Sequence, residues 1–412
     1  MIGRLSQRLL VNRSVALLFF GQVISQAGDS IYQIGLLWLC YELTGSRSLT
    51  GLMASAAFLP YLLLALPAGI LADRFSRRAI MIVADGARFL LVGLLPLLHG
   101  LGALSILALG LFTFAIESFS ALFYPARDAL LPAIAPRDRL PQANALLQTS
   151  WQLAFLIGPS AAAVLLPYTG LIHLFTADAF TFLVSLLALA AISVPRASRT
   201  VAPATPAWHD IREGLAFVVH DRRMRMIVFI TAVDNLFVMG PAVVGMVLFV
   251  RDTLHLGARE GAWIAACYAA GAIVGAPVVA RLAGSLPLGR LLLVGVVLDG
   301  LTFLPLFWVR TFTGAGLTIV VHSLFIPLIT VSRTTLIQRA APAHLQGRMF
   351  AIIQMAVVGV TALSTLLTGL VGEWVGAPWI FLGAGLLAAA SAVPGFLTAA
   401  LWEDDARPNA RG

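Results

Sequence analysis

Long apolar runs separated by short polar segments dominate the chain. The runs have lengths of about 18 to 25 residues, which a helix needs to cross a hydrocarbon core of roughly 30 Å. Membrane strands need only about 10 alternating residues, so the pattern favours helices over a barrel. We predict twelve spans, at residues 14–42, 48–72, 79–98, 102–124, 141–166, 171–194, 225–250, 259–282, 289–308, 313–335, 347–372 and 377–401.

One long polar connection divides these spans six and six. It runs from Pro195 to Asp221 and starts with a Pro/Ala/Thr-rich piece. The apolar positions of its second part are Trp208, Ile211, Leu215, Phe217 and Val218. This pattern predicts a linker followed by an amphipathic helix on the membrane surface. We therefore expect a six-helix half at 1–195, a cytoplasmic linker at 196–222 and a second six-helix half at 223–412.

The two halves share weak internal similarity. Near the fourth and tenth spans, Arg127, Leu130, Ala135 and Pro136 match Arg333, Leu336, Ala341 and Pro342 at an offset of 206 residues. In the third and ninth spans, Asp85, Gly86 and Phe89 match Asp299, Gly300 and Phe303. Two parallel six-helix repeats are predicted, an arrangement in which a substrate site forms between the halves near the middle of the membrane.

Composition and charge agree with a membrane location. Apolar residues make up 59% of the chain and charged residues 11%, too few to keep a protein surface hydrated. All 27 basic residues are arginines, and they lie mostly in short loops, so the net charge of +8 reflects topology rather than nucleic-acid binding. Most arginines fall on one side of the predicted membrane, which places both termini in the cytoplasm.

The loop between the second and third spans reads GILADRFSRR from Gly69 to Arg78. It resembles the loop signature of the major facilitator superfamily, with Ser76 where the second glycine is usual. The resemblance implies a cytoplasmic latch formed by Gly69, Asp73, Arg74, Arg77, Arg78 and Asp128. In this latch Asp73 accepts hydrogen bonds from a helix N-terminus and Arg77 pairs with Asp128. The alternative is that the arginines act as topology signals alone.

The first span carries Gly21-Gln22, Gly28-Asp29 and Tyr32-Gln33. This pattern is similar to the bacterial branch of the superfamily that contains the enterobactin exporter and macrolide efflux proteins. The resemblance implies an all-α membrane protein with the major facilitator fold, in the bacterial inner membrane. We expect a monomeric, proton-coupled exporter of small amphipathic compounds of drug or siderophore type. A lipid or lysophospholipid transporter on the same fold is the alternative.

Polar residues form stripes on two spans. Gln22, Gln26, Asp29 and Gln33 lie at i, i+4, i+7 and i+11, on one helical face. An acidic side chain at mid-membrane costs roughly 2.5 to 3.5 kcal/mol, so Asp29 is expected to face a cavity and to bind a proton or cation. A packing carboxylate with fixed hydrogen bonds is the alternative. Thr113, Glu117, Ser120 and Tyr124 repeat the pattern on span four, with Glu117 as the second candidate.

The other intramembrane polar residues give weaker signals. Asp234 and Asn235 are the third candidate site, and Tyr32, Gln148, Trp151 and Gln152 are candidate cavity-wall residues. Asp85 and Arg88 are three residues apart, so we expect them to pair and to snorkel toward the interface. Asp178, Asp299 and His322 lack a long polar stripe and are expected to be packing residues.

Soluble and catalytic chemistry is not indicated. The sequence contains no phosphate-binding Gly-x-x-x-x-Gly-Lys-Ser/Thr loop and no Gly-x-Ser-x-Gly motif. His322 has no further ligand residue at metal-site spacing. We therefore expect no cofactor and no metal, and an enzyme or a non-transporting receptor is the weaker hypothesis.

Overall fold

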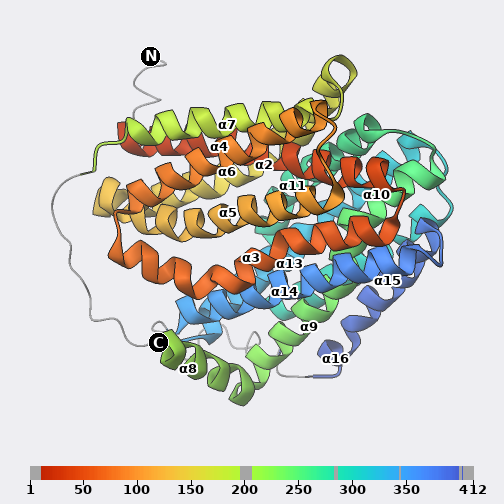
Figure 1. Ribbon diagram of the computed structural model, residues 1–412. Helices are drawn as coiled ribbons and strands as arrows, with labels where there is room; N and C mark the ends of the chain where they lie inside the picture. Colours follow the sequence, from red (N-terminus) through yellow and green to blue (C-terminus); the bar gives the residue numbers. More distant parts are fainter. Residues whose placement is uncertain (1–10, 195–206, 283–285, 343–344, 399–400, 402–412) are drawn as a thin grey trace, which may run out of the picture. The chain divides into compact units, whose positions relative to one another are not determined.

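The computed structural model describes residues 11–194, 207–282, 286–342, 345–398 and 401 (Figure 1). These residues are almost entirely helical and include no strand. The chain divides into two compact units. The first comprises Met1–Gly45 and Ala56–Pro203, and the second comprises Ser46–Ser55 and Ala204–Gly412.

The first unit is a bundle of long helices. They are α2 (Arg13–Thr44), α4 (Arg77–Gly100), α5 (Ile106–Ile134), α6 (Leu140–Thr169), α7 (His173–Ala190) and the larger part of α3 (Arg47–Arg74), with the short η1 (Arg137–Arg139) before α6. Helix α2 packs against α6 and α7, and α4 packs against α5 and α7 (Figure 1). Apolar side chains such as Leu18, Met81 and Phe123 form a buried core in this bundle.

The second unit has more interrupted helices. They are α8 (Ala207–His220), α9 (Arg222–Gly240), the π-helices η2 (Pro241–Gly245) and η3 (Phe249–Thr253) flanking α10 (Met246–Leu248), α11 (Ala258–Leu282), α12 (Leu288–Leu301), the 3₁₀ turn η4 (Leu304–Phe307), α13 (Phe312–Ala340), α14 (Gln346–Gly372), α15 (Ala377–Ser391) and α16 (Val393–Phe396). Helix α13 packs against α11 and α12, and α9 packs against α14. The predicted surface helix of the linker corresponds to α8, whose Glu213 pairs with Arg348. The Pro/Ala/Thr-rich piece lies outside the described residues, as do the side chains of Trp208 and Ile211.

Short polar residues begin many of the helices. Asn12, Ser76, Ser105, Asp221 and Thr311 are N-caps whose side chains accept a backbone N–H bond from the first turn. Helices α5 and α13 both have 29 residues and begin at equivalent positions of the predicted repeat. The weak sequence similarity thus corresponds to two helices with matching boundaries.

Eleven described helical segments are long and apolar enough to cross a membrane. Helix α2, which contains the first predicted span, has 32 residues but is not among them. Its glutamines and Asp29 lower the mean hydropathy of a helix that is otherwise long enough. The predicted end of span four, at residue 124, was wrong, because α5 continues to Ile134.

A close contact between α2 and α6 depends on Gly158. A Cβ atom at this position would lie 2.5 Å from the carbonyl oxygen of Ala27. Gly158→Val is therefore expected to lower stability by about 1–3 kcal/mol, because a branched side chain would push the helices apart. The thermal unfolding midpoint of detergent-solubilised protein measures this effect. Gly383→Ala is the control, since a Cβ there meets no atom within 4 Å, and equal midpoints for the two variants would contradict the prediction.

Candidate functional site

The polar stripe of α2 turns toward the interior of the first unit. Gln22 and Gln26 are buried, and Gln26 Nε2 donates to Gln22 Oε1 at 3.2 Å. From α6, Ser150 Oγ donates to Gln26 Oε1 at 3.2 Å, and from α5, Arg127 Nη1 donates to Gln22 Oε1 at 3.4 Å. Gln33 is partly buried farther along the same helix. The stripe is therefore a line of hydrogen-bonded side chains between α2, α5 and α6.

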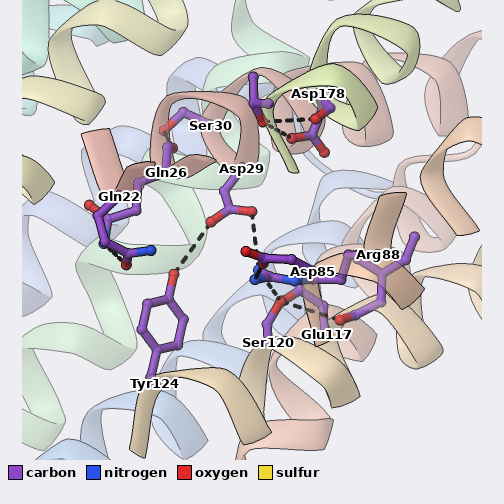
Figure 2. A network of polar contacts seen from close by, with 12 residues as sticks. Gln22, Gln26, Asp29, Ser30, Asp85, Arg88, Glu117, Ser120, Tyr124 and Asp178 are labelled. Carbon is purple, nitrogen blue, oxygen red and sulfur yellow. Dashed lines mark hydrogen bonds and ion pairs between the residues drawn. The ribbon is translucent and has the colours of Figure 1, made fainter. Parts of the chain in front are cut away.

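Asp29 lies at the end of this line beside a buried arginine. Arg88 Nη1 on α4 is 3.8 Å from Asp29 Oδ1, and Arg88 Nη2 pairs with Asp85 Oδ1 (Figure 2). The side chain of Asp29 is 31% exposed, whereas those of Arg88 and Asp85 are at most 1% exposed. Asp29 is thus the accessible carboxylate of a three-residue cluster.

The surroundings of Arg88 explain why it stays in the interior. Its guanidinium lies over the rings of Phe123 (4.7 Å) and Phe182 (4.3 Å), and Nη1 donates to Ser120 Oγ at 3.3 Å. These aromatic and hydroxyl groups replace water around the cation. The predicted Asp85–Arg88 pair is present, but our expectation that it snorkels toward the interface was wrong.

Tyrosine hydroxyl groups bind the acids of α2 and α5, and a third tyrosine joins the two helices. Tyr61 Oη on α3 donates to Glu117 Oε2 at 2.9 Å, and Tyr124 Oη donates to Asp29 Oδ2 at 3.4 Å. The hydroxyl groups of Tyr32 and Thr113 are hydrogen-bonded at 2.9 Å. Two of the polar residues on span four, Glu117 and Tyr124, therefore face the same region as Asp29 (Figure 2).

Asp178 of α7 joins the cluster. It is fully buried, and Thr181 Oγ1 donates to its Oδ1 at 3.1 Å, while Oδ2 has no hydrogen-bond partner within the described part of the chain. A Cβ at Gly28 would clash with Asp178 and Thr181, so glycine permits this close approach of α7 to α2. Asp178 consequently interacts electrostatically with both Asp29 and Glu117.

The cluster has more acidic than basic groups. Asp29, Asp85, Glu117 and Asp178 come from four helices, and Asp85 and Asp29 pair with the guanidinium of Arg88 (Figure 2). A second arginine, Arg127, forms an ion pair with Asp128 at 2.8 Å and lies over the ring of Tyr124. Several carboxylates close together cannot all be ionised without strong repulsion. The arrangement therefore favours binding of protons or another cation.

Arg77 and Arg78, at the start of α4, contact backbone carbonyl groups of α5 and α7. Arg77 Nη1 donates to the carbonyl of Ala129 at 2.9 Å, and Arg78 Nε donates to the carbonyl of Leu189 at 2.8 Å. The last carbonyl groups of a helix have no intrahelical hydrogen-bond partner, and they attract cations. The contact of Arg78 with the end of α7 is of this kind. The expected pairing of Arg77 with Asp128 was wrong, because Asp128 pairs with Arg127. Gly69 and Arg74 lie in the last turns of α3, and the side chain of Asp73 is outside the described residues.

The remaining candidates lie elsewhere. Asp234 and Asn235 are buried on α9 in the second unit, where Asn235 Nδ2 donates to the carbonyl of Thr231 at 2.7 Å. The candidate cavity-wall residues of α6 lie on an exposed face of that helix; they are Gln148, Trp151 and Gln152. In the described ranges, no group of three or more His, Cys, Asp or Glu side chains could hold a metal ion.

Comparison with known proteins identifies the family. The Major Facilitator Superfamily model matches residues 18–357 and 228–411, which together span almost the entire chain. The chain belongs to the major facilitator superfamily. The resemblance seen in the 69–78 loop and the first span is thus confirmed, and so is the all-α transporter fold. As a member of this superfamily, the protein is a multi-pass membrane transporter of small molecules.

Several relatives are efflux proteins. The chain is 28% identical over 408 residues to the multidrug efflux pump Tap of Mycobacterium tuberculosis, covering 97% of both chains. It is 24% identical over 197 residues to macrolide efflux protein A of Streptococcus pyogenes, covering 48% of this chain and 49% of the other. The crystal structure of a bacterial homologue of the human lysosomal transporter Spinster has a TM-score of 0.76 at 14% identity, covering 97% and 98% of the two chains.

Sequence reasoning gave Asp85, Arg88 and Asp178 structural roles only, and it did not single out Tyr61. Arg88 is preceded and followed by apolar residues, and this signal of a buried cation was interpreted as snorkelling. Tyr61 and Asp178 stand alone on their helices, so periodicity contains no trace of their partners. Only the packing of α3 and α7 against the other helices brings them to the site.

Proposed function

We infer that the protein is a proton-coupled exporter of small amphipathic compounds that works by alternating access. The observation that carries this proposal is the cluster of four carboxyl groups, two of which pair with Arg88. Such a cluster changes its charge when a proton enters or leaves, and it lies where the first unit is lined by hydrogen-bonding side chains. The membership of efflux pumps in the same superfamily supports the direction of transport.

The coupling follows from the position of Asp29. When Asp29 is ionised, Arg88 is shared between two carboxylates on α2 and α4. A proton on Asp29 removes this attraction and leaves Arg88 paired with Asp85. The contact between α2 and α4 then weakens. The equilibrium between conformations therefore shifts toward the conformation that lacks this contact. A cationic solute competes with the proton for the same carboxylates.

The cargo class follows from the side chains around Asp29 and Glu117. Tyr61 and Tyr124 place aromatic rings next to carboxylates, a combination that suits a lipophilic, often cationic compound. We propose drug-like or siderophore-like solutes. The mycobacterial relative is a multidrug efflux pump, which supports this class.

The distribution of arginines supports an orientation with both termini in the cytoplasm. Because the relatives are bacterial proteins, we propose that the protein lies in the bacterial inner membrane. We propose that the protein works as a monomer, because all helices of the cluster belong to one chain. The proposed coupling ion is the proton.

Reconstitution in liposomes tests the proposal. An imposed gradient of one pH unit should drive a lipophilic cationic dye against the proton flux, up to a roughly tenfold concentration ratio for one proton per dye. Glu117→Gln should reduce this ratio severalfold, whereas Glu42→Gln, an exposed acid near the end of α2, should leave it unchanged. Proton coupling is refuted if the wild-type protein moves dye at an unchanged rate after the pH gradient is collapsed, with no change in lumenal pH.

A further inference from the structure

A second buried polar group lies in the second unit, on α12 and α13. His322 is 1% exposed and Asp299 is 2% exposed, and His322 Nε2 is 3.4 Å from Asp299 Oδ1. The ring of Phe303 stacks on the imidazole at a centroid distance of 4.1 Å, and the ring of Tyr268 lies 6.2 Å away. Asp299 Oδ1 has no hydrogen-bond partner in the described part of the chain. A buried acceptor facing a ring nitrogen in this way needs an explanation.

The hydroxyl of Thr302 determines which ring nitrogen carries the proton. Thr302 Oγ1 is 2.5 Å from the carbonyl oxygen of Leu298, and two oxygens this close require a hydrogen between them. The single hydroxyl proton is therefore donated to Leu298, and Oγ1 accepts from His322 Nδ1, 2.9 Å away. In the neutral ring Nε2 is then an acceptor, and it faces the acceptor Oδ1 of Asp299.

One proton converts this repulsive contact into a hydrogen bond. With the proton between Asp299 Oδ1 and His322 Nε2, the pair is neutral overall and both atoms are satisfied. Without it, a bare carboxylate remains in an aromatic, water-poor environment, which is unfavourable. The geometry thus creates a position for one exchangeable proton.

The neighbouring titratable and charged groups strengthen this position. Asp234 of α9 interacts electrostatically with Asp299, so ionisation of both acids is disfavoured. The cation that interacts with Asp234 is Arg333 of α13, and Tyr268 of α11 interacts electrostatically with Asp299. Helix α15 has no titratable residue, and the one charged residue of α14, Arg348, pairs with Glu213.

We propose that Asp299 and His322 form a second proton-binding site, located in the C-terminal unit and separate from the Asp29 cluster. Its contribution to transport rests on the proposed proton coupling. Asp299 matches Asp85 in the internal repeat, and both are buried acids of the third helix of their half. In the first half a fixed arginine partners the acid, whereas in the second half a histidine that can exchange its proton does so. The second half therefore holds a proton where the first holds a permanent ion pair.

Infrared difference spectroscopy of the purified full-length protein during a pH titration tests the site without any substrate. One protonated-carboxyl band should be lost in Asp299→Asn, and it should change frequency in His322→Leu, which removes the acceptor. Thr302→Val frees Nδ1 and lets the ring place its proton on Nε2, where it stabilises the carboxylate, so the band should disappear at lower pH than in the wild type. Ser332→Ala, which removes a buried hydroxyl from the same helix, should leave the band unchanged.

The outcomes are distinct from those of the transport assay. If Asp299→Asn removes no band, or if Thr302→Val and Ser332→Ala have the same titration as the wild type, the second site is refuted even when proton-driven transport is present. If Asp299→Asn does not fold, the comparison of Thr302→Val with Ser332→Ala decides. A failure of dye transport leaves the infrared result standing and refutes the proposed function alone.

Discussion

Asp29→Asn is expected to abolish gradient-driven accumulation of solute while leaving solute exchange across the membrane intact. Asparagine has the shape of aspartate and still accepts from Tyr124, but it cannot bind or release a proton. A gradient of one pH unit supplies about 1.4 kcal/mol per proton, which corresponds to a tenfold solute ratio. Without a titrating group at this position, the ratio should fall to about one. Proteoliposomes loaded with dye on both sides measure exchange and accumulation in the same preparation.

Glu42→Gln is the matched control for Asp29→Asn, because Glu42 is an exposed acid on the same helix. Exchange in the Asp29→Asn protein shows that the variant is folded and can still alternate. A folded Asp29→Asn protein that accumulates dye to the wild-type ratio would remove Asp29 from the coupling mechanism. It would return Asp29 to the role of a packing carboxylate.

Arg88→Met is expected to be the most destabilising single substitution in the first unit. It removes the guanidinium that pairs with Asp85 and lies near Asp29, and leaves fully buried Asp85 without its cation. Removing one partner of a buried ion pair costs about 3–5 kcal/mol. Lost contacts with Phe123 and Phe182 add to this cost. The measurement is the thermal midpoint and folded yield of the detergent-solubilised protein.

Arg139→Met is the control for charge removal. Arg139 is 42% exposed and lies 4.0 Å from Asp138, so its loss should cost less than about 1 kcal/mol. The double variant Asp85→Asn with Arg88→Met should recover part of the stability, because it no longer buries an unpaired carboxylate. Equal midpoints for Arg88→Met and Arg139→Met would contradict the interpretation of Arg88 as the centre of the cluster.

Local signals explain why the helices could be predicted. An apolar run of membrane length is sufficient to specify a spanning helix, since backbone groups in lipid must be hydrogen-bonded within the segment. The cap Thr311 lies just before the predicted run 313–335, whereas the cap Ser105 lies inside the predicted run 102–124. The end of α5 was missed because the segment after Tyr124 contains Pro125, Arg127 and Asp128, which are more typical of a loop.

The candidate site was predictable only in part. Periodicity placed Gln22, Gln26 and Asp29 on one face of α2, and Glu117 and Tyr124 on one side of α5, and the structure brings these two faces together. The sequence also placed Asp234 and Asn235 among the candidates, but it did not indicate their neighbours. The partner of Arg77 was predicted wrongly, because the acid nearest in sequence to the expected position, Asp128, has its own neighbouring arginine.

The sequence by itself determined the all-α membrane fold and the superfamily, because each depends on composition, spacing or motif within a short stretch of chain. Only the tertiary structure decided that Asp29 also lies beside Arg88 and that Asp299 faces His322. These contacts join residues 20 to more than 100 positions apart, such as His322 with Thr302 and Tyr124 with Asp29 at 95 positions. Their partners follow from how helices pack, and helix packing depends on complementary surfaces that no single helical face encodes.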